Sequence, residues 1–248
     1  AAMNVPCMSV RRRPKVAILA TGDEIVRPGD NINPHQIVSS NSYTLAALIK
    51  AAGGEPIILG IAPDTIEGIQ SFFETRIGAD LIITTGGASV GQHDLIQKAL
   101  VKDSFGTNGL DIDFWRIAMR PGKPMIFGRI SDTPMLGLPG NPVSTMVCGL
   151  IFVKPAIKKM LGACVINDKT TKASLLEPLL ENDERQDYVR AINFINEDGR
   201  KVVKVFDRQD SSMMKLLTHA NCLIVRPPHD HSHIAGEEVE ILEFEEGF

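Results

Sequence analysis

The sequence lacks the features that mark a membrane, secreted or nucleic-acid-binding protein. No apolar run approaches the roughly 20 residues needed to cross a bilayer, and the N-terminus has no hydrophobic segment of the signal-peptide kind. The 26 basic and 30 acidic residues give a net charge of −4, which disfavours a surface for polyanions. We therefore expect a globular protein that binds neither a membrane nor nucleic acid.

Cysteine is also scarce, and its four copies are far apart. No C-x-x-C pair is present, so the spacing indicates neither a cysteine zinc site nor a disulfide framework. This pattern favours a reducing, cytoplasmic compartment. The apolar share of 44% over 248 residues is still ample for the core of one large domain or of two ordinary ones.

The first 160 residues alternate between strand-like and helix-like segments. Continuous apolar runs predict strands that are buried on both faces, and capping or glycine signals bound the helices between them. The alternation predicts an α/β fold, a three-layer domain with a mostly parallel sheet. The expected strands are 16–20, 56–61, 81–85 and a pair around 112–119 and 134–138, and the expected helices are 42–52, 64–78, 94–103 and one from 141.

Three of these helices have recognisable boundaries. Asn41 or Ser42 is expected to cap the first helix, and the segment 64–67, "DTIE", has the spacing of a capping box. The last helix begins with Asn141 as its cap and proline at its first position. It is apolar, and we expect Lys154-Pro155 to end it.

The pattern changes after Gly162. Short β-like runs follow, separated by turn signals such as Glu197-Asp198-Gly199, and they predict a small all-β barrel domain. The runs are 172–182, 186–195, 200–206, 221–228 and 237–244. We therefore divide the chain into a linker remnant (1–13), an α/β domain (14–162) and a C-terminal barrel domain (163–248).

Polar side chains cluster where the predicted parallel strands end. In a doubly wound sheet, ligands bind beyond the carboxyl ends of the strands, where loops and helix N-termini meet. We expect one pocket to hold all of these residues, which are Asp23, Glu24, Asp64, Ser89, Asp94, Arg120, Lys123, Asn141 and Ser144.

The loop "TTGGASVGQHD", residues 84–94, is unusually rich in glycine. Gly86, Gly87 and Gly91 either serve the turn alone or let backbone N–H groups approach an anion at a helix N-terminus, and we favour the second interpretation. Lys123 stands on a stiff loop, "PGKP", which suits the capture of an anion.

The acidic residues have two interpretations each. The adjacent carboxylates Asp23 and Glu24 suit a hard cation such as Mg²⁺ that bridges phosphate oxygens, although a solvated turn is the alternative. Asp64 is equally well interpreted as a helix cap or as a ligand.

The segment "PPHDHSH" contains three alternating histidines, His229, His231 and His233. On a strand, this spacing would place three imidazoles on one side and indicate zinc. Two prolines before it and Gly236 after it favour a flexible surface loop instead. We therefore assign no metal to this segment.

A series of motifs, taken together, resembles one known family. The segments "VAILATGDEIVRPGD", "SNSYTLAALIKAAGGEP", "LGIAPD", "ITTGGASVGQHD", "RPGKPMIFG" and "LGLPGNPVS" occur in this order. They resemble the central domain of the molybdopterin molybdenumtransferases, the MoeA and gephyrin-E family. The later segments "RQDYVRA", "QDSSMMKLLTHANCLIV" and "AGEEVEI" resemble that family's C-terminal barrel.

The resemblance implies an enzyme of molybdenum cofactor biosynthesis. Its members insert molybdate into adenylylated molybdopterin with Mg²⁺ and release AMP. The implied catalytic acids are Glu24, Asp64, Asp94 and Asp23, of which Asp94, Glu24 and Asp64 would bind the metal. The implied contacts to pterin phosphate and molybdate are Gly86, Gly87, Ser89, Gly91, Lys123, Asn141, Ser144, Arg190 and Ser211.

The chain departs from the family pattern in two respects. The family usually carries Asp-Ser-Asn where this chain has Ser39-Ser40-Asn41. Family members also begin with two further domains, so we expect this chain to be a fragment of a longer, homodimeric protein. An adenylyltransferase of the MogA type is an expected partner and also an alternative identity. A gephyrin-like scaffold that binds peptides is a second alternative.

Overall fold

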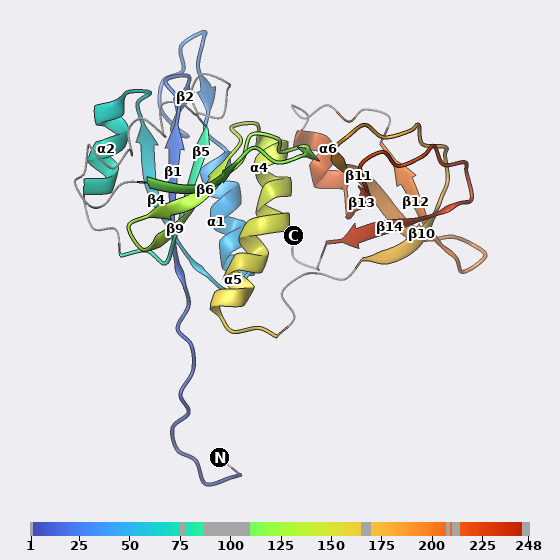
Figure 1. The fold of residues 1–248 in the computed structure, drawn as a ribbon, viewed down its shortest axis with the longest axis horizontal. Coiled ribbons are helices and arrows are strands. Elements are labelled where there is room, and N and C mark those ends of the chain that lie inside the picture. Colours follow the sequence, from blue (N-terminus) through green and yellow to red (C-terminus); the bar gives the residue numbers. More distant parts are fainter. Residues whose placement is uncertain are drawn as a thin grey trace.

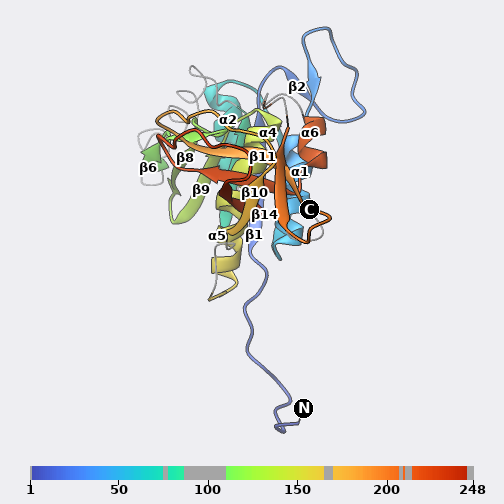
Figure 2. The same ribbon diagram turned by 90° about the vertical axis from the view of Figure 1, so that its right-hand side faces the viewer.

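The computed structural model describes residues 2–74, 78–86, 110–164, 170–206, 209 and 214–244. An α/β domain lies beside a smaller β domain, and the first residues extend away from the body of the protein (Figures 1 and 2). Among the described residues, no helix is long and apolar enough to cross a membrane.

The larger sheet has six strands in the order β4-β1-β5-β9-β8-β6. Strand β1 pairs in parallel with β4 and β5, and β5 pairs in parallel with β9. Strands β8 and β6 add antiparallel pairs at one edge. The bounds are β1 Lys15–Thr21, β4 Glu55–Ala62, β5 Leu81–Gly86, β6 Leu110–Trp115, β8 Ile126–Ile130 and β9 Thr133–Leu138.

Helices cover both faces of this sheet, as the α/β pattern predicts. Alternate residues of β1 enter opposite hydrophobic clusters, so Val16 packs with one set of helices and Ala17 with another. One face carries α1 (Asn41–Ala51), α4 (Pro142–Cys148) and α5 (Lys154–Met160), and the other carries α2 (Ile66–Glu74). The three-layer prediction is confirmed.

The helix starts agree only in part with the predicted caps. Asn141 caps α4 as expected, because its Oδ1 accepts hydrogen bonds from the backbone N–H groups of Val143 and Ser144. Helix α2 is preceded by Thr65, whose Oγ1 accepts a hydrogen bond from the N–H of Gly68. Helix α1 already begins at Asn41, so Asn41 and Ser42 lie within it and the expectation that one of them caps it is wrong. The residue at the cap position is Ser40, whose side chain makes no capping hydrogen bond.

The prediction that Lys154 and Pro155 end the last helix is also wrong. A π-helical turn, η2 (Gly149–Val153), joins α4 to α5 without a break. The N–H of Lys154 bonds to the carbonyl of Gly149, five residues earlier. Pro155 has no N–H to donate, so it is tolerated near the start of the next α-helical segment.

The C-terminal strands form a closed five-stranded barrel. Their order is β12-β10-β14-β13-β11, and a β11–β12 pairing closes the ring. The bounds are β10 Thr171–Leu175, β11 Gln186–Ile195, β12 Lys201–Val205, β13 Cys222–Arg226 and β14 Glu238–Glu243, with a helix α6 at Met214–His219. The barrel prediction is confirmed, although the first run stops at Leu175, before Pro178.

A short strand of the α/β domain, β7 (Met119–Arg120), pairs in parallel with β11 of the barrel. The Arg120 guanidinium donates to Asn182 Oδ1 at 3.3 Å, to Asp183 Oδ2 at 3.2 Å and to Asp187. The pKa of Asp183 lies well below its usual range because Arg185 hydrogen-bonds it and Arg120 adds positive charge. We call this contact the interdomain clasp.

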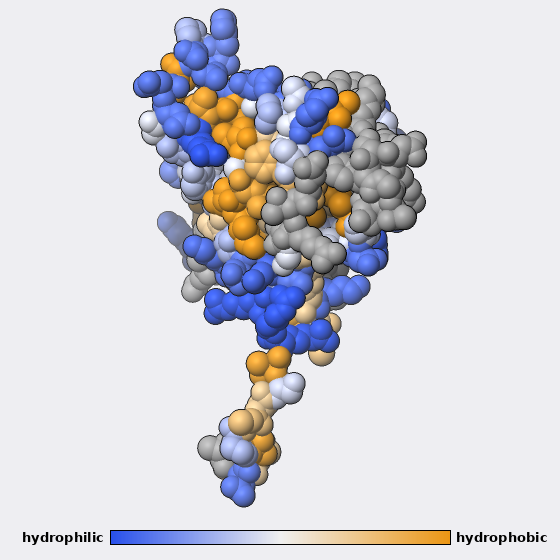
Figure 3. All heavy atoms as spheres, turned by 90° about the vertical axis from the view of Figure 1, so that its left-hand side faces the viewer, coloured by the Kyte–Doolittle hydropathy of each residue, from blue (hydrophilic) through white to orange (hydrophobic). Residues whose placement is uncertain are grey.

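Other elements shape the surface of the α/β domain. Strands β2 (Ile25–Val26) and β3 (Ile37–Val38) pair in a projection above the sheet (Figure 1). Figure 3 shows a hydrophobic band across the side where β4 and α2 lie. Ile58 of β4 and Ile66 of α2 are among the exposed hydrophobic residues.

We predict that Gly86→Ala strongly destabilises the chain. Gly86 has φ +94°, and an added Cβ would lie 2.0 Å from the carbonyl oxygen of Thr21. We expect a loss of about 3 kcal/mol or more in the free energy of unfolding, measured by denaturant titration. Gly29→Ala is the matched control, because Gly29 has the same φ with no atom within 4 Å; it should lose about 1–2 kcal/mol. Equal losses would show that the contact with Thr21 is unimportant.

We predict that Arg120→Ala weakens the interdomain clasp. The substitution leaves the buried Asp187 without its cation, and we expect a loss of about 2 kcal/mol at neutral pH after allowing for the exposed part of Arg120. Lys172→Ala, which removes an exposed pair with Glu238, should cost about 0.5 kcal/mol or less.

The effect of Arg120→Ala should also depend on pH. The positive charge of Arg120 adds to the lowering of the Asp183 pKa, although the hydrogen bonds from Arg185 lower it more. The stability that Arg120 supplies through Asp183 is present above the usual Asp range and disappears as the pH falls and the carboxylate is protonated. The difference between the parent and Arg120→Ala should therefore shrink in acid. A difference that stays constant across the acid range would argue against the clasp as its source.

Candidate functional site

The carboxyl ends of β1, β5 and β9 open into a cleft of about 350 Å³, which we call the sheet-end cleft. The end of β5, the segments that follow β1 and β9, and the N-terminus of α1 contribute to it. Its polar lining includes four of the residues predicted from sequence, Glu24, Gly86, Asn141 and Ser144. The position is the one expected for a ligand site in a doubly wound sheet.

Gly86 brings these loops into close contact. It pairs with Thr21 in the β1–β5 register, and its Cα lies 3.1 Å from where a Cβ on Gly140 would be. The requirement for glycine here comes from backbone crowding, which supports the turn interpretation at this position. Gly87, Ser89, Gly91, Asp94 and the helix expected at 94–103 lie outside the described residues, as does Ser211.

Three predicted acids gather beside the sheet-end cleft. The backbone N–H of Asp64 donates to Asp23 Oδ1 at 3.0 Å. Partial burial, followed by the negative charges of Asp23 and Glu24, raises the pKa of Asp64. In the described part of the chain, the carboxylate oxygens of these three acids do not all lie within 4.8 Å of one another. The acids thus form a region of negative potential without a closed three-carboxylate cage.

A second cleft, of about 550 Å³, lies between the α/β domain and the barrel. We call it the interdomain cleft. Lys123 and Arg190 line it from the two domains, and Ser144 and Pro124 line both clefts. The single pocket expected from sequence is therefore two clefts that meet at Ser144 and Pro124.

The cationic side chains of the interdomain cleft differ in their exposure and in their contacts with other residues. Arg120 and Arg185 bond to carboxylates of the barrel, so Arg120 contributes to domain docking in addition to lining the cleft, where it was expected. Arg190 is only 2% exposed, and its backbone exchanges two hydrogen bonds with the side chain of Gln209. Lys123 is exposed, and its ammonium has no side-chain partner among the residues that the structure describes.

Asn141 caps helix α4 in addition to lining the sheet-end cleft. Its Oδ1 accepts from two N–H groups of α4, so these backbone donors are already satisfied. The hydroxyl of Ser144 lies 3.5 Å from the same oxygen. An anion near Ser144 would therefore depend mainly on side-chain donors.

Several polar residues of the sheet-end cleft were not among the predicted ligand-binding residues. The Thr21 hydroxyl is buried and lacks a hydrogen-bond partner within the described residues. Asn41 Nδ2 donates to Thr85 Oγ1 at 3.0 Å and to the carbonyl of Gly140 at 2.7 Å, which ties α1 to strand β5 and to the loop after β9. Ser39, the position of the missing acid, also lines this cleft. The sequence did offer a signal for these positions, because threonines stand at the carboxyl ends of the predicted strands, Thr21 in β1 and Thr85 in β5.

Comparisons with known proteins agree with this arrangement. Residues 17–159 match the family described as "Probable molybdopterin binding domain", and residues 172–244 match the "MoeA C-terminal region (domain IV)". The chain is 33% identical to a molybdopterin molybdenumtransferase of Haemophilus influenzae over 98% of the chain and 59% of that protein. A Nostoc protein of the same name is also 33% identical, over 98% of the chain and 56% of its own length.

Solved structures give the same result. The molybdopterin biosynthesis MoeA protein of Pyrococcus horikoshii superposes with a TM-score of 0.76 at 28% identity, covering 94% of this chain and 55% of that one. This chain spans just over half the length of the curated relatives it matches. It therefore belongs to the molybdopterin molybdenumtransferase (MoeA) family, of which it carries the molybdopterin-binding domain and the C-terminal region.

Proposed function

We propose that this chain binds adenylylated molybdopterin and molybdate and takes part in molybdate insertion with release of AMP. The names of its relatives support the reaction class. The observation that carries the proposal is the meeting of the two clefts at Ser144, with acids beside one cleft and cations in the other.

This charge distribution suits the two substrates. Molybdate is a tetrahedral dianion, and Lys123, Arg190 and the Ser144 hydroxyl offer the cations and the hydroxyl donor that such an ion requires. Lys123 is the most accessible of these groups because it is exposed. We assign the interdomain cleft to molybdate and the sheet-end cleft to the pterin phosphate.

The acids beside the sheet-end cleft are suited to Mg²⁺. Their oxygen donors are of the type that this ion prefers. Burial, and after it the negative charges of Asp23 and Glu24, raise the pKa of Asp64, so a cation beside these acids would favour the charged carboxylate. Glu24 and Asp64 would hold the ion, with Asp23 positioning the Asp64 backbone. Mg²⁺ would supply positive charge against phosphate oxygens. Because the acids do not form a closed cage, water would complete the coordination.

The proposal extends to the setting of the longer protein. A homodimer, an adenylyltransferase partner of the MogA type and a cytoplasmic location belong to it. The hydrophobic band on the β4 and α2 side (Figure 3) supports a protein contact there.

The first test is AMP release from adenylylated molybdopterin, with Mg²⁺ and with molybdate present or omitted. Molybdate-dependent release supports the proposal. Binding of the pterin without release would refute insertion by this chain alone, and absence of binding would refute the assignment of both clefts. Consumption of ATP with unmodified molybdopterin would instead indicate an adenylyltransferase.

We predict that Lys123→Ala raises the molybdate concentration needed for half-maximal AMP release by about ten-fold or more, because a cation is lost from a dianion site. Binding of the pterin in the other cleft should change less. Lys159→Ala, an exposed lysine near the end of α5, is the matched control and should behave as the parent. A Lys123→Ala variant with unchanged molybdate dependence would exclude Lys123 from the molybdate site.

We predict opposite effects of Asp64→Asn on stability and activity. The raised pKa means that the charged carboxylate is disfavoured in the folded state, so removing the charge should raise Tm at neutral pH. At a pH below about 3, where Asp64 is protonated folded or unfolded, the gain should vanish. Mg²⁺-dependent AMP release should fall sharply at neutral pH. A variant with full activity would exclude Asp64 as a metal ligand.

A further inference from the structure

Residues 227–234, which we call the histidine loop, have no part in the proposed function. The expectation of a loop is confirmed, but the expectation of a surface position is wrong for two of its residues. The side chains of Asp230 and His233 are each 12% exposed. The loop is held against residues 179–183, because His233 and Leu179 exchange two backbone hydrogen bonds of 2.9 Å and the N–H of Asn182 donates to the carbonyl of Asp230.

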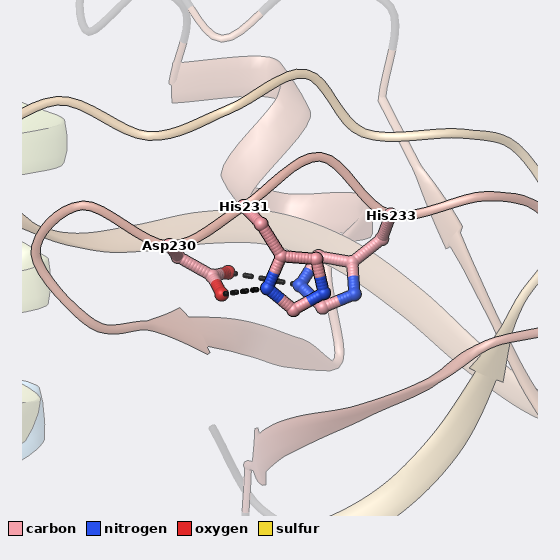
Figure 4. A group of neighbouring side chains, drawn as sticks. All are labelled: Asp230, His231 and His233. Carbon is pink, nitrogen blue, oxygen red and sulfur yellow. Dashed lines mark hydrogen bonds and ion pairs between the residues drawn. The ribbon is translucent and has the colours of Figure 1, made fainter.

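Three side chains of this loop converge (Figure 4). Asp230 Oδ2 lies 3.0 Å from His233 Nε2, and Asp230 Oδ1 lies 3.6 Å from His231 Nδ1. The two imidazole rings are 4.3 Å apart between centroids. One ligand atom from each residue lies within 4.8 Å of the other two, and within the described ranges of the chain this is the one such group of three or more.

The spacing matches a tetrahedral ion. Two ligands on such an ion, with bonds of about 2.0–2.1 Å, lie about 3.4 Å apart. The separations of 3.0 Å (His233 Nε2 to Asp230 Oδ2) and 3.6 Å (His231 Nδ1 to Asp230 Oδ1) lie on either side of that value, although they involve the two different oxygens of the carboxylate. Only small side-chain shifts are therefore needed for two imidazole nitrogens and a carboxylate to reach one ion.

The surroundings of His233 are those of a metal-ligating histidine. Its Nδ1 lies 3.0 Å from Glu237 Oε2, while Nε2 faces Asp230. Ligating histidines usually donate their second ring N–H to a carboxylate, which fixes the tautomer and the ring orientation. Glu237 is itself held, since it accepts a hydrogen bond from the N–H of Ile234 at 3.0 Å.

Arg226 orients the other two members of the group. Its Nε donates to Asp230 Oδ2 at 3.0 Å, and its Nη2 donates to the carbonyl of His231 at 3.1 Å. Asp230 Oδ1 faces His231 without a contact to Arg226. The arrangement is thus preorganised by backbone and side-chain bonds on several sides.

A cleft of about 380 Å³ opens beside the group. Asp230 and His233 line it together with Arg226, which is paired with Asp230, and with Glu238 and Glu240, which add negative charge at the approach. The cleft gives an ion and its water ligands a route to the loop.

The geometry points to a zinc-binding site formed by Asp230, His231 and His233, with Glu237 orienting His233 and water completing the coordination. Nitrogen and carboxylate donors in this number are typical of Zn²⁺ with an open position. A bound ion would link three side chains of the histidine loop to one another. It would thereby stiffen the side of the barrel that the interdomain clasp contacts.

The test is a Zn²⁺ titration against a competing chromophoric chelator, with Mg²⁺ in excess to occupy sites made only of carboxylates. The parent should carry Cys7→Ser and Cys164→Ser, because these two thiols are exposed. We expect one equivalent of Zn²⁺ per chain. His231→Ala and Glu237→Gln should each weaken binding by about ten-fold or more.

His229→Ala is the matched control, because His229 is exposed in the same loop and stands outside the group. It should bind Zn²⁺ as the parent does. Since the His231 side chain is 75% exposed, its removal should leave the circular dichroism spectrum unchanged. Co²⁺ should give the parent an absorption spectrum of tetrahedral type that His231→Ala lacks.

Two results would overturn the inference. One is a folded parent that binds no stoichiometric Zn²⁺. The other is equal affinity in the parent, His231→Ala and Glu237→Gln, or equal weakening in His229→Ala. In either case the group would be an ion-pair network around Asp230 with no role in metal binding.

Discussion

The pairing of β7 with β11 is the contact on which the candidate site depends. It places a loop of the α/β domain against the barrel, so Lys123 and Arg190 line one cleft although they belong to different domains. The buried carboxylate of Asp187 requires a cation, and Arg120 supplies it. Hydrophobic packing reinforces the contact, because Leu223 and Leu242 of the barrel join the core cluster of the α/β domain. The interdomain cleft exists only while this docking holds.

The site separates charge of opposite sign across a short surface. Asp23, Glu24 and Asp64 lie beside the sheet-end cleft, whereas Lys123 and Arg190 line the interdomain cleft. The acids repel one another, which is a cost to stability that the fold tolerates. The histidine loop shows the opposite arrangement, because the largely buried carboxylate of Asp230 is surrounded by Arg226 and two imidazoles.

Local signals in the sequence predicted most of the fold. Apolar runs located the parallel strands β1, β4, β5 and β9, and alternating runs with turns located all five barrel strands. The cap at Asn141 was predictable because capping involves only the next few residues. Strand β8 was missed, since it is short and contains Gly128, whose added Cβ would lie 2.3 Å from the carbonyl oxygen of Asp111 on β6. Its glycine reflects contact with a neighbouring strand, which no local pattern reveals.

The sequence by itself therefore determined the fold class, the family and the set of polar residues at the strand ends, because periodicity, capping and motif order are properties of short segments. The tertiary structure alone decided which of these residues meet. It divided the expected pocket into two clefts, assigned Arg120 to domain docking and brought Asp230 to His231 and His233. These outcomes depend on distances between side chains whose positions are set by strand pairing, loop anchoring and the burial of charge, none of which is encoded within a single segment.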